Sequence, residues 1–362
     1  MWLQVSLIFL LACALLVVLY IHFKMRKPIE YLVYQVDDKF DTSKPSDPLY
    51  QPLNELFKTT DQIKNANLIT FSDYALIDNN IEAITKSSSN RAYIYAIHGS
   101  DLMANKSILA DSFQEANLQK YIADTIVLNN KKELDLKEGR IYFLKKNVQR
   151  QEGNLITKDI EYIKTKAAED GYVVCQELLQ NPFLVNDRKI NLRVYLLIVC
   201  DGRNKPEMYF YNNGFIYYTP SNFETNSIKK DVNITTGYID RQVYVDNPMT
   251  HKELYAFMGH EKSKKLQDNM MEFFREFKQV YVEKFDKLNN DHFRFNIFGV
   301  DIAPDENLEV KIMEVNKAPD LSYKDARDSE VKLNMVKDMM NLVGIFDEVG
   351  DSSNFLNINN IS

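Results

Sequence analysis

Cysteine is scarce in this chain, which has 3 in 362 residues, namely Cys13, Cys175 and Cys200. They are widely spaced, odd in number and lack a CxxC or His-rich pattern, which excludes a disulfide framework and a zinc site. Cys175 and Cys200 lie in apolar, strand-like runs, so we expect buried free thiols there. The predicted compartment is therefore reducing.

An excess of positive charge is also absent. Lys and Arg number 44 against 51 Asp and Glu, which gives a formal charge of -7. Because phosphate backbones are bound by clustered Lys and Arg, a general nucleic-acid binder is excluded. The chain is 45% hydrophobic, which suffices for a sizeable core and for two or three domains.

Charge is missing altogether from residues 1–23, which contain no Asp, Glu, Lys or Arg. A run of that length can cross a bilayer, which needs ~20 apolar residues, and it lacks the basic start and clear cleavage site of a signal peptide. Lys24, Arg26 and Lys27 follow it, so the positive-inside rule places the C-terminal body in the cytosol. The sequence thus predicts a single-pass membrane protein anchored by an N-terminal helix.

The rest of the chain predicts an α+β body. Residues 24–52 are polar and rich in proline, which is typical of a tether. After residue 53, strand-like and helix-like segments alternate without an internal repeat. We expect these domains: a reduced N-terminal region at 53–98, a central lobe at 99–178, a C-terminal lobe at 179–349 and a flexible tail at 350–362.

Three local patterns give sharper expectations. "PEMYFYNNGFIYYTP" predicts a β-hairpin that turns at Asn212, Asn213 and Gly214. Residues 262–288 carry apolar side chains at helical spacing, which predicts one long amphipathic helix whose aromatic stripe belongs to the core. Residues 294–316 contain two apolar strands around a turn at 304–307, which predicts a second hairpin.

The second hairpin carries candidate metal ligands. Alternation along a strand puts Glu314 and Asn316 on one face, and a turn between Glu306 and Asn307 adds Asp301 from the partner strand. Adjacent carboxylates repel each other and are costly to bury, so such a cluster favours a cation. Carboxylate and amide oxygens suit Mg²⁺. A solvated strand face is an equally weighted alternative.

Several scattered cations are candidate phosphate ligands. Each is ordinarily a surface charge, and only a shared site would make it a ligand. The single glycine of "RQEGN" at 150–154 is a weak signal for a phosphate-covering loop, and a surface turn explains it equally well. The candidates are Lys106, Lys145 or Lys146, Lys189 and Arg193.

The order of motifs resembles the tubulin-tyrosine ligase-like proteins, which are amino-acid ligases with the ATP-grasp fold. The resemblance lies in "VVCQELLQNPFLVNDRKINLRVYLLIV", "YFYNNGFIYY", "FNIFGVDI" and "KIMEVNKAP", and it covers roughly residues 90 to 345. It implies an ATP-grasp body, in which two α+β lobes clasp ATP and Mg²⁺.

The resemblance also implies roles for individual residues. The family's metal ligands fall on Asp301, Glu314 and Asn316. Adenine recognition falls on Gln176 and the backbone near Leu178. The lysines that face phosphates fall on Lys106 and on Lys145, with Lys146 as a shift by one. The "RKxDxR" motif falls on Arg188, Lys189, Asn191 and Arg193. Lys189 and Asn191 would bind nucleotide, and the catalytic residues would be Lys189 and Arg193, with Arg193 binding the acyl phosphate or the acceptor carboxylate.

Three positions depart from the family pattern. Asn191 stands where the motif has Asp, Tyr217 where an arginine follows the "EG" turn, and residues 233–236 where the family has "HLTN". The missing arginine puts in doubt how a substrate carboxylate is held. Lys229, Lys230 or Arg241 are candidate replacements, although each alone is better explained as a loop charge.

The function implied by the resemblance is ligation of a free amino acid to a carboxylate of a protein or peptide acceptor, such as tubulin or another acidic tail, through an acyl phosphate. ATP and Mg²⁺ would be the cofactors. Two alternatives stay open: a membrane-tethered pseudoenzyme that binds nucleotide or a partner, and a ligase acting on small molecules.

Overall fold

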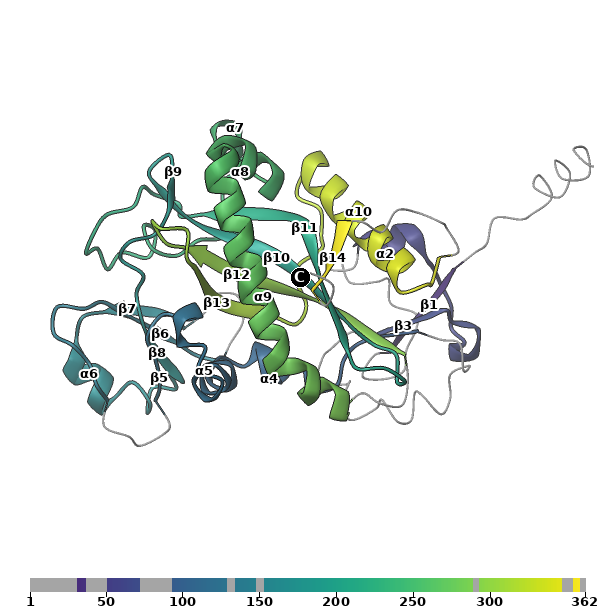
Figure 1. Ribbon diagram of the computed structural model, residues 1–362, viewed down its shortest axis with the longest axis horizontal. Helices are drawn as coiled ribbons and strands as arrows, with labels where there is room; N and C mark the ends of the chain where they lie inside the picture. The colour runs from purple at the N-terminus through teal and green to yellow at the C-terminus, as the bar shows by residue number, and fades with distance from the viewer. Residues whose placement is uncertain are drawn as a thin grey trace, which may run out of the picture.

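The computed structural model describes residues 31–36, 51–71, 93–128, 134–147, 153–288, 293–346 and 354–358. These residues form an α+β body built on two β-sheets (Figure 1). The mixture of strands and helices confirms the predicted α+β class.

The larger sheet has ten strands within the described residues, in the order β14-β11-β10-β12-β4-β3-β1-β2, with β13 on β12 and β9 on β10. Strands β1 to β4 pair in parallel, whereas β10 to β13 pair antiparallel. Their bounds are Leu32–Val36 (β1), Lys58–Thr59 (β2), Leu68–Phe71 (β3), Tyr93–Tyr95 (β4), Leu184–Val185 (β9), Arg188–Cys200 (β10), Glu207–Tyr218 (β11), Arg294–Pro304 (β12), Val310–Asn316 (β13) and Phe355–Asn357 (β14).

The smaller sheet runs β5-β8-β6-β7 and is antiparallel throughout. Leu144 and Cys175 on this sheet pack with Ile163 of the adjoining helix α6 in a small core of their own. The sheet thus forms a separate lobe beside the larger one (Figure 1). The bounds are Thr125–Val127 (β5), Tyr142–Lys145 (β6), Leu155–Thr157 (β7), Val174–Glu177 (β8) and Ile160–Thr165 (α6).

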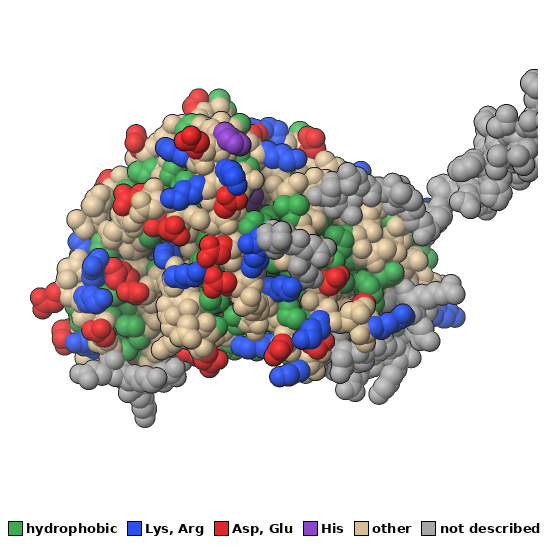
Figure 2. All heavy atoms as spheres, in the orientation of Figure 1, with side chains coloured by type: hydrophobic (Ala, Val, Ile, Leu, Met, Phe, Trp, Pro, Cys, Tyr) green, Lys and Arg blue, Asp and Glu red, His purple; other side chains and the backbone are tan. Residues whose placement is uncertain are grey.

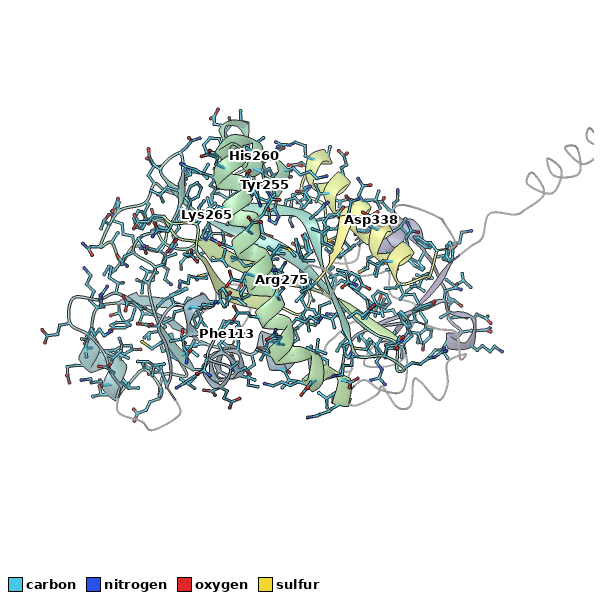
Figure 3. The ribbon with its side chains drawn as sticks, viewed as in Figure 1. Phe113, Tyr255, His260, Lys265, Arg275 and Asp338 are labelled. Carbon is cyan, nitrogen blue, oxygen red and sulfur yellow. The ribbon has the colours of Figure 1, made fainter. Side chains whose placement is uncertain are left out.

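Helix α9 (His260–Leu288) crosses the larger sheet (Figure 1) and confirms the long amphipathic helix predicted for 262–288. Phe274 of α9 stacks on Phe210 of β11 with ring centroids 5.5 Å apart. Phe113 of α5 packs against Phe277 from the side of the smaller lobe (Figure 3). The aromatic stripe is therefore core, as expected. The other helices are Gln51–Leu56 (α2), Asp101–Ala104 (α4), Lys106–Glu115 (α5), Val243–Asp246 (α7), His251–Met258 (α8) and Ala326–Leu342 (α10), and short 3₁₀ turns lie at Ile63–Asn65 and Gln119–Tyr121.

The predicted hairpin turn at residues 212–214 is wrong, because β11 is one continuous strand from Glu207 to Tyr218. The pairing of β11 with β10 shifts register there instead, which is typical of a bulge. Asn212 Nδ2 donates to Asn354 Oδ1, and Asn213 Oδ1 accepts from Lys252 N. A Cβ on Gly214 would lie 2.2 Å from the carbonyl oxygen of Arg193. The glycine is therefore needed because β10 and β11 approach closely here, and not because the chain turns.

Two segments predicted to be irregular contain strands. Residues 355–357, in the predicted tail, form β14 and pair with β11, with Tyr209 opposite Asn357. Residues 32–36, in the predicted tether, form β1 inside the larger sheet. Both strands are short, and their pairing partners lie far away in the sequence, so local periodicity could not indicate them.

The prediction of a single-pass membrane location is corrected by the structure. Of the helices in the described ranges, none is long and apolar enough to cross a bilayer. The longest, α9, carries charged residues in each of its turns, which a spanning helix cannot do. Residues 1–23, on which the predicted transmembrane helix falls, lie outside the described residues, as does most of the tether at 24–52.

Candidate functional site

A cleft of about 670 Å³ lies between the two sheets. Strands β6 and β8 of the smaller sheet supply one side, and strands β10 to β13 supply the other. The loop at 233–241 and the start of α10 close the remaining wall. Of the residues predicted for the site, the lining includes Lys145, Gln176, Leu178, Lys189, Asn191, Arg193, Asp301, Glu314 and Asn316.

Strand register brings the predicted metal ligands together. Asp301 of β12 lies directly opposite Glu314 of β13 and directly opposite Arg193 of β10. Asn316 lies two residues beyond Glu314 and lines the same cleft. Its amide Nδ2 donates to Glu314 Oε1 over 3.3 Å, which leaves the amide oxygen available as a ligand. The three side chains therefore meet as expected, although a register shift between Asp301 and Ile302, and not plain alternation from a turn between Glu306 and Asn307, sets Asp301 opposite Glu314.

The two carboxylates of this cluster differ electrostatically. Burial raises the pKa of Asp301 to about 6, although Arg193 opposes the shift. Arg193 Nε and Nη2 donate to Asp301 Oδ1 and Oδ2 at 2.6 and 2.9 Å, a bidentate buried pair. Burial also raises the pKa of Glu314, but Lys106, Lys145 and Arg193 outweigh it, so that pKa lies below its ordinary value.

The donor set fits a hard divalent cation. Two carboxylates and an amide oxygen are ligands typical of Mg²⁺, which keeps its other positions for water and substrate phosphates. Among the described residues no group of three or more His, Cys, Asp and Glu gathers at one place. Asp301, Glu314 and Asn316 would supply three ligands, which suits a cation whose other positions are filled by water and phosphate oxygens.

Two buried lysines, which we call the lysine wall, face the cleft from either sheet. Lys145 Nζ donates to Gln176 Oε1 at 2.8 Å and to the carbonyl of Met313 at 3.1 Å. Lys189 is 4% exposed and has no ion-pair partner among the described residues. Burial lowers the pKa of each lysine to about 8. Neither lysine forms an ion pair within the described residues, although Glu314 is near enough to Lys145 to raise its pKa, so both suit an anion supplied from outside.

The predicted adenine contacts have other partners in this structure. Gln176 Nε2 donates to Thr125 Oγ1 at 3.0 Å, so both ends of its amide are engaged. The backbone N–H of Leu178 donates to the Ile141 carbonyl at 2.8 Å. Both residues line the cleft, and their role toward adenine stays a prediction.

Lys106 lies at the start of α5 and is not among the residues that line the cleft. Asn105 caps that helix by accepting from Ser107 N and Ile108 N. Lys106 is nevertheless near enough to lower the pKa of Glu314 and of Lys145. Lys106 therefore acts on the site through the charge of its ammonium group.

The three departures from the family pattern lie on or beside the cleft. Asn191 Oδ1 is buried without a hydrogen-bond partner in the described part of the chain, and Asn191 stands opposite Tyr217 in the sheet. The ring of Tyr217 covers the Arg193 guanidinium at 4.9 Å. Asn233 Nδ2 donates to the carbonyls of Ser227 and Lys229, so its side chain holds the loop.

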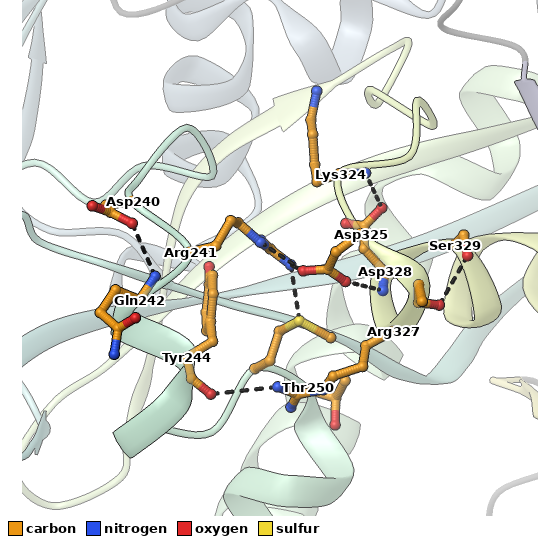
Figure 4. Close-up of polar contacts among 12 residues, drawn as sticks. Asp240, Arg241, Gln242, Tyr244, Thr250, Lys324, Asp325, Arg327, Asp328 and Ser329 are labelled. Atoms are coloured by element: carbon orange, nitrogen blue, oxygen red, sulfur yellow. Dashed lines mark hydrogen bonds and ion pairs between the residues drawn. The ribbon is translucent and has the colours of Figure 1, made fainter.

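Three cations of the remaining wall are each paired with an aspartate, and we call them the paired wall. Arg241 Nη2 lies 2.5 Å from Asp325 Oδ2 (Figure 4). Lys324 Nζ lies 3.0 Å from Asp320 Oδ2, and Lys332 Nζ lies 2.9 Å from Asp328 Oδ2. Sequence reasoning missed Lys332 and Asp328, whose i,i+4 spacing on a helix is the one local signal of a pair.

The candidate replacements for the missing arginine differ in whether they line the cleft. Arg241 lines the cleft. Lys229 instead pairs with Glu224 on the outside of the molecule, with 63% of its side chain exposed, and Lys230 is also exposed. Arg188 Nη1 donates to the Thr219 carbonyl and therefore supports the strand end rather than the cleft. On the face shown in Figure 2, basic and acidic side chains are interspersed over α9 and the smaller lobe.

A cleft between two α+β lobes, with buried lysines and hard metal ligands inside it, is consistent with the ATP-grasp class of fold. A family model described as "Tubulin-tyrosine ligase family" matches residues 54–352. The chain therefore belongs to the tubulin-tyrosine ligase family.

Individual relatives are more distant. The chain is 24% identical over 209 residues to a probable tubulin polyglutamylase TTLL9 of Bos taurus, in a region covering 55% of this chain and 44% of that protein. It is 26% identical over 184 residues to a probable tubulin polyglutamylase of Caenorhabditis elegans, covering 48% and 43%. It is 28% identical over 162 residues to the protein polyglycylase TTLL10 of Rattus norvegicus, covering 41% and 23%. The chain thus spans less than half the length of these relatives.

Proposed function

We propose that this chain is an ATP- and Mg²⁺-dependent ligase that joins a free amino acid to a carboxylate of a protein or peptide acceptor. The observation that carries the proposal is one cleft in which Asp301, Glu314 and Asn316 meet the buried Lys145 and Lys189. Hard ligands beside unpaired buried cations are what a metal-bound polyphosphate requires.

Bound ATP would supply the phosphoryl group that turns the acceptor carboxylate into an acyl phosphate, with ADP as the leaving group. Attack by the amine of the amino acid would then form the amide bond, release phosphate and free a proton. Asp301, Glu314 and Asn316 would hold the metal. Lys145 and Lys189 would bind phosphate oxygens and neutralise the negative charge that builds up there.

Arg193 is positioned by two neighbours rather than free to move. Asp301 takes two of its nitrogens, and Tyr217 covers its plane. A Cβ on Gly299 would lie 3.0 Å from Arg193 Nη1, so the glycine leaves room for the third nitrogen. We assign that nitrogen to the acyl phosphate or the acceptor carboxylate, as a fixed donor that needs no rearrangement.

The acceptor class is proposed from the relatives. Several of them are named as tubulin polyglutamylases and one as a protein polyglycylase. We propose a protein acceptor of the same kind, namely the acidic tail of tubulin or a similar Glu-rich segment. Lys106, whose charge acts on Glu314, would assist in drawing polyphosphate to the cleft.

The test is ADP release by the full chain with ATP, Mg²⁺, single amino acids and either tubulin or Glu-rich peptides. We expect turnover that requires both an amino acid and an acceptor. Glu314→Gln should reduce it at least ~10²-fold, since the metal loses a charged ligand. Glu309→Gln, on the exposed turn of the same hairpin, is the matched control and should leave turnover unchanged.

A second candidate function is nucleotide binding without ligation. The observation that favours it is Arg193, which is engaged by Asp301 and covered by a tyrosine where the family has an arginine. ATP binding with no amino-acid-stimulated ADP release would establish this second function and refute the first. Turnover with an amino acid and a small acceptor, but not with peptides, would point to a small-molecule ligase.

A further inference from the structure

An exposed aromatic side chain stands where the loop at 233–241 meets the segment at 318–324, a place that we call the rim of the cleft. Tyr238 is 72% exposed and also lines the cleft. The other large apolar side chains that are exposed in the described residues do not line it, among them Val245 and Phe257. Because single exposed apolar residues are ordinary, the position of Tyr238 and not its exposure alone sets it apart.

Tyr238 is held in place from two directions. Its backbone N–H donates to Thr236 Oγ1 at 3.1 Å within the loop. Its hydroxyl donates to Asp320 Oδ2 at 3.1 Å, in the segment that follows β13. Lys324 Nζ, from the same segment, lies 5.1 Å from the centre of the ring. A ring fixed in this way loses little conformational entropy when a ligand packs on it.

The loop that carries Tyr238 is itself anchored at both ends. Arg241 Nε donates to Asp325 Oδ2 at 2.8 Å, which joins the loop to the start of α10 (Figure 4). Ile234 packs against the apolar cluster that contains Ile156 of β7, so the loop also contacts the smaller lobe. The rim is therefore present before any substrate binds.

Tyr238 lies at the outer end of a row of side chains that begins at Arg193. The ring of Tyr217 covers the Arg193 guanidinium at 4.9 Å. A Cβ on Gly237 would lie 3.0 Å from the Tyr217 ring, and Tyr238 follows Gly237 directly in the chain. Exposure rises along the row, from 8% at Arg193 through the half-buried Tyr217 to Tyr238. The row thus leads outward from the guanidinium that we assign to the acceptor.

We propose that Tyr238 binds the main chain of an extended polypeptide acceptor beside the glutamate that is modified. The inference rests on the proposed ligase function. ATP and the amino acid would end within the cleft, whereas a polypeptide continues beyond its reacting carboxylate and has to cross the rim. The exposed ring offers apolar surface to the backbone and to the methylene groups of neighbouring glutamates. Tyr238 therefore favours a polypeptide over a single glutamate, which is too short to contact the rim.

The experiment compares two acceptors in ADP release by the full chain with ATP, Mg²⁺ and the best amino acid. One acceptor is a Glu-rich peptide of about twelve residues, ~40 Å long when extended, and the other is a single glutamate blocked at both ends. We expect the wild-type kcat/KM to be higher for the peptide. Tyr238→Ala should reduce this preference about tenfold, mainly by raising the KM for the peptide, as truncation of an interface aromatic does. Tyr238→Phe keeps the ring and should retain the preference.

Phe257→Ala is the matched control, because it removes an aromatic side chain that is 51% exposed on α8, outside the cleft. This variant should keep the wild-type preference. A merely structural role of Tyr238 would lower the activity with both acceptors to the same extent. An equal loss with both acceptors, or a preference that Tyr238→Ala leaves unchanged, overturns the inference and leaves the ligase function standing.

Peptide binding is measured separately, by fluorescence anisotropy of the labelled peptide with the full chain, ATP and Mg²⁺. Absence of ADP release with every acceptor overturns the ligase function. Equal affinity of the wild type and Tyr238→Ala for the peptide overturns the inference, whereas weaker binding by the variant supports it. If Tyr238→Ala does not fold, nitration of Tyr238 in the wild-type chain decides: protection by the peptide supports the inference, and unchanged nitration overturns it.

Discussion

Lys189 and Lys332 are buried to the same extent, each 4% exposed, on different walls of one cleft. Lys332 lies 2.9 Å from Asp328, whereas Lys189 has no ion-pair partner among the described residues. Burial lowers the pKa of both, and for Lys332 the aspartate opposes that shift. The fold therefore satisfies one buried lysine internally and leaves the other for a ligand.

The difference separates structural charge from functional charge. Burying an ion pair costs desolvation free energy, but the pair fixes the packing of the elements that carry it. Both of its charges are used within the protein, so neither is available to a ligand. An unpaired buried cation destabilises the empty protein and gains its partner only when an anion binds. Four variants or conditions test this contrast, and they follow in order of the expected effect.

Lys332→Met should cause the largest effect. Methionine keeps the length of the side chain but leaves Asp328 buried and unpaired, so we expect the free energy of unfolding to fall by ~3–5 kcal/mol. Urea denaturation of the variant and the wild type measures this. A loss below about 1 kcal/mol would mean that Lys332 is no more structural than Lys189.

Lys189→Met should leave the free energy of unfolding unchanged or higher, because it removes an unpaired buried charge. The variant should instead bind ATP more weakly. We expect the dissociation constant for ATP to rise ~10–100-fold, because a charge-assisted hydrogen bond worth ~1.5–3 kcal/mol is lost. Calorimetric titration measures the affinity. Lys252→Met, on the exposed face of α8, is the control, and a variant that loses stability but not affinity would reverse the contrast.

The pH dependence should follow Lys189. Its pKa is lowered from 10.5 in the unfolded chain to about 8 in the folded one, so the unfolded chain binds more protons between these values. Stability should therefore rise with pH from 8 to 10.5 relative to Lys189→Met, and ATP affinity should fall above pH 8 by at most about tenfold per unit. Parallel pH profiles for the wild type and the variant would contradict this.

Lys229→Ala should have the smallest effect. The pair with Glu224 is exposed, with 63% and 53% of the two side chains accessible, so we expect a change in unfolding free energy below ~0.5 kcal/mol. ADP release should be unaffected. A marked loss of turnover would return Lys229 to the list of replacements for the missing arginine.

The sequence predicted the β12–β13 hairpin because a turn at 304–307 between two apolar strands is a local signal. Helix α9 was predictable for the same reason, since its apolar spacing is local. Alternation predicted that Asp301, Glu314 and Asn316 share a face, but the structure sets Asp301 opposite Glu314 through a register shift between Asp301 and Ile302. The grouping of the three side chains could therefore be predicted from the residues, whereas the irregularity that produces it could not.

The rest of the site depends on contacts between distant segments. Nothing near Arg241 in the sequence indicates Asp325, which lies 84 residues away. The pairing of Lys332 with Asp328 is local, but its burial comes from packing of α10 against β11 and the cleft, so the pair looked like a solvated helix face. The "NNG" signal for a turn was overridden by pairing of β11 with strands on both sides.

Strand β14 has a consequence for handling the protein. It pairs with β11 from residues 355 to 357, and beyond β11 the order of the sheet continues directly to β10, the strand of Lys189 and Arg193. A chain shortened before residue 355 would leave backbone groups of β11 without partners and open an edge to self-association. By covering the edge of β11, strand β14 thus protects the sheet from self-association next to the candidate active site.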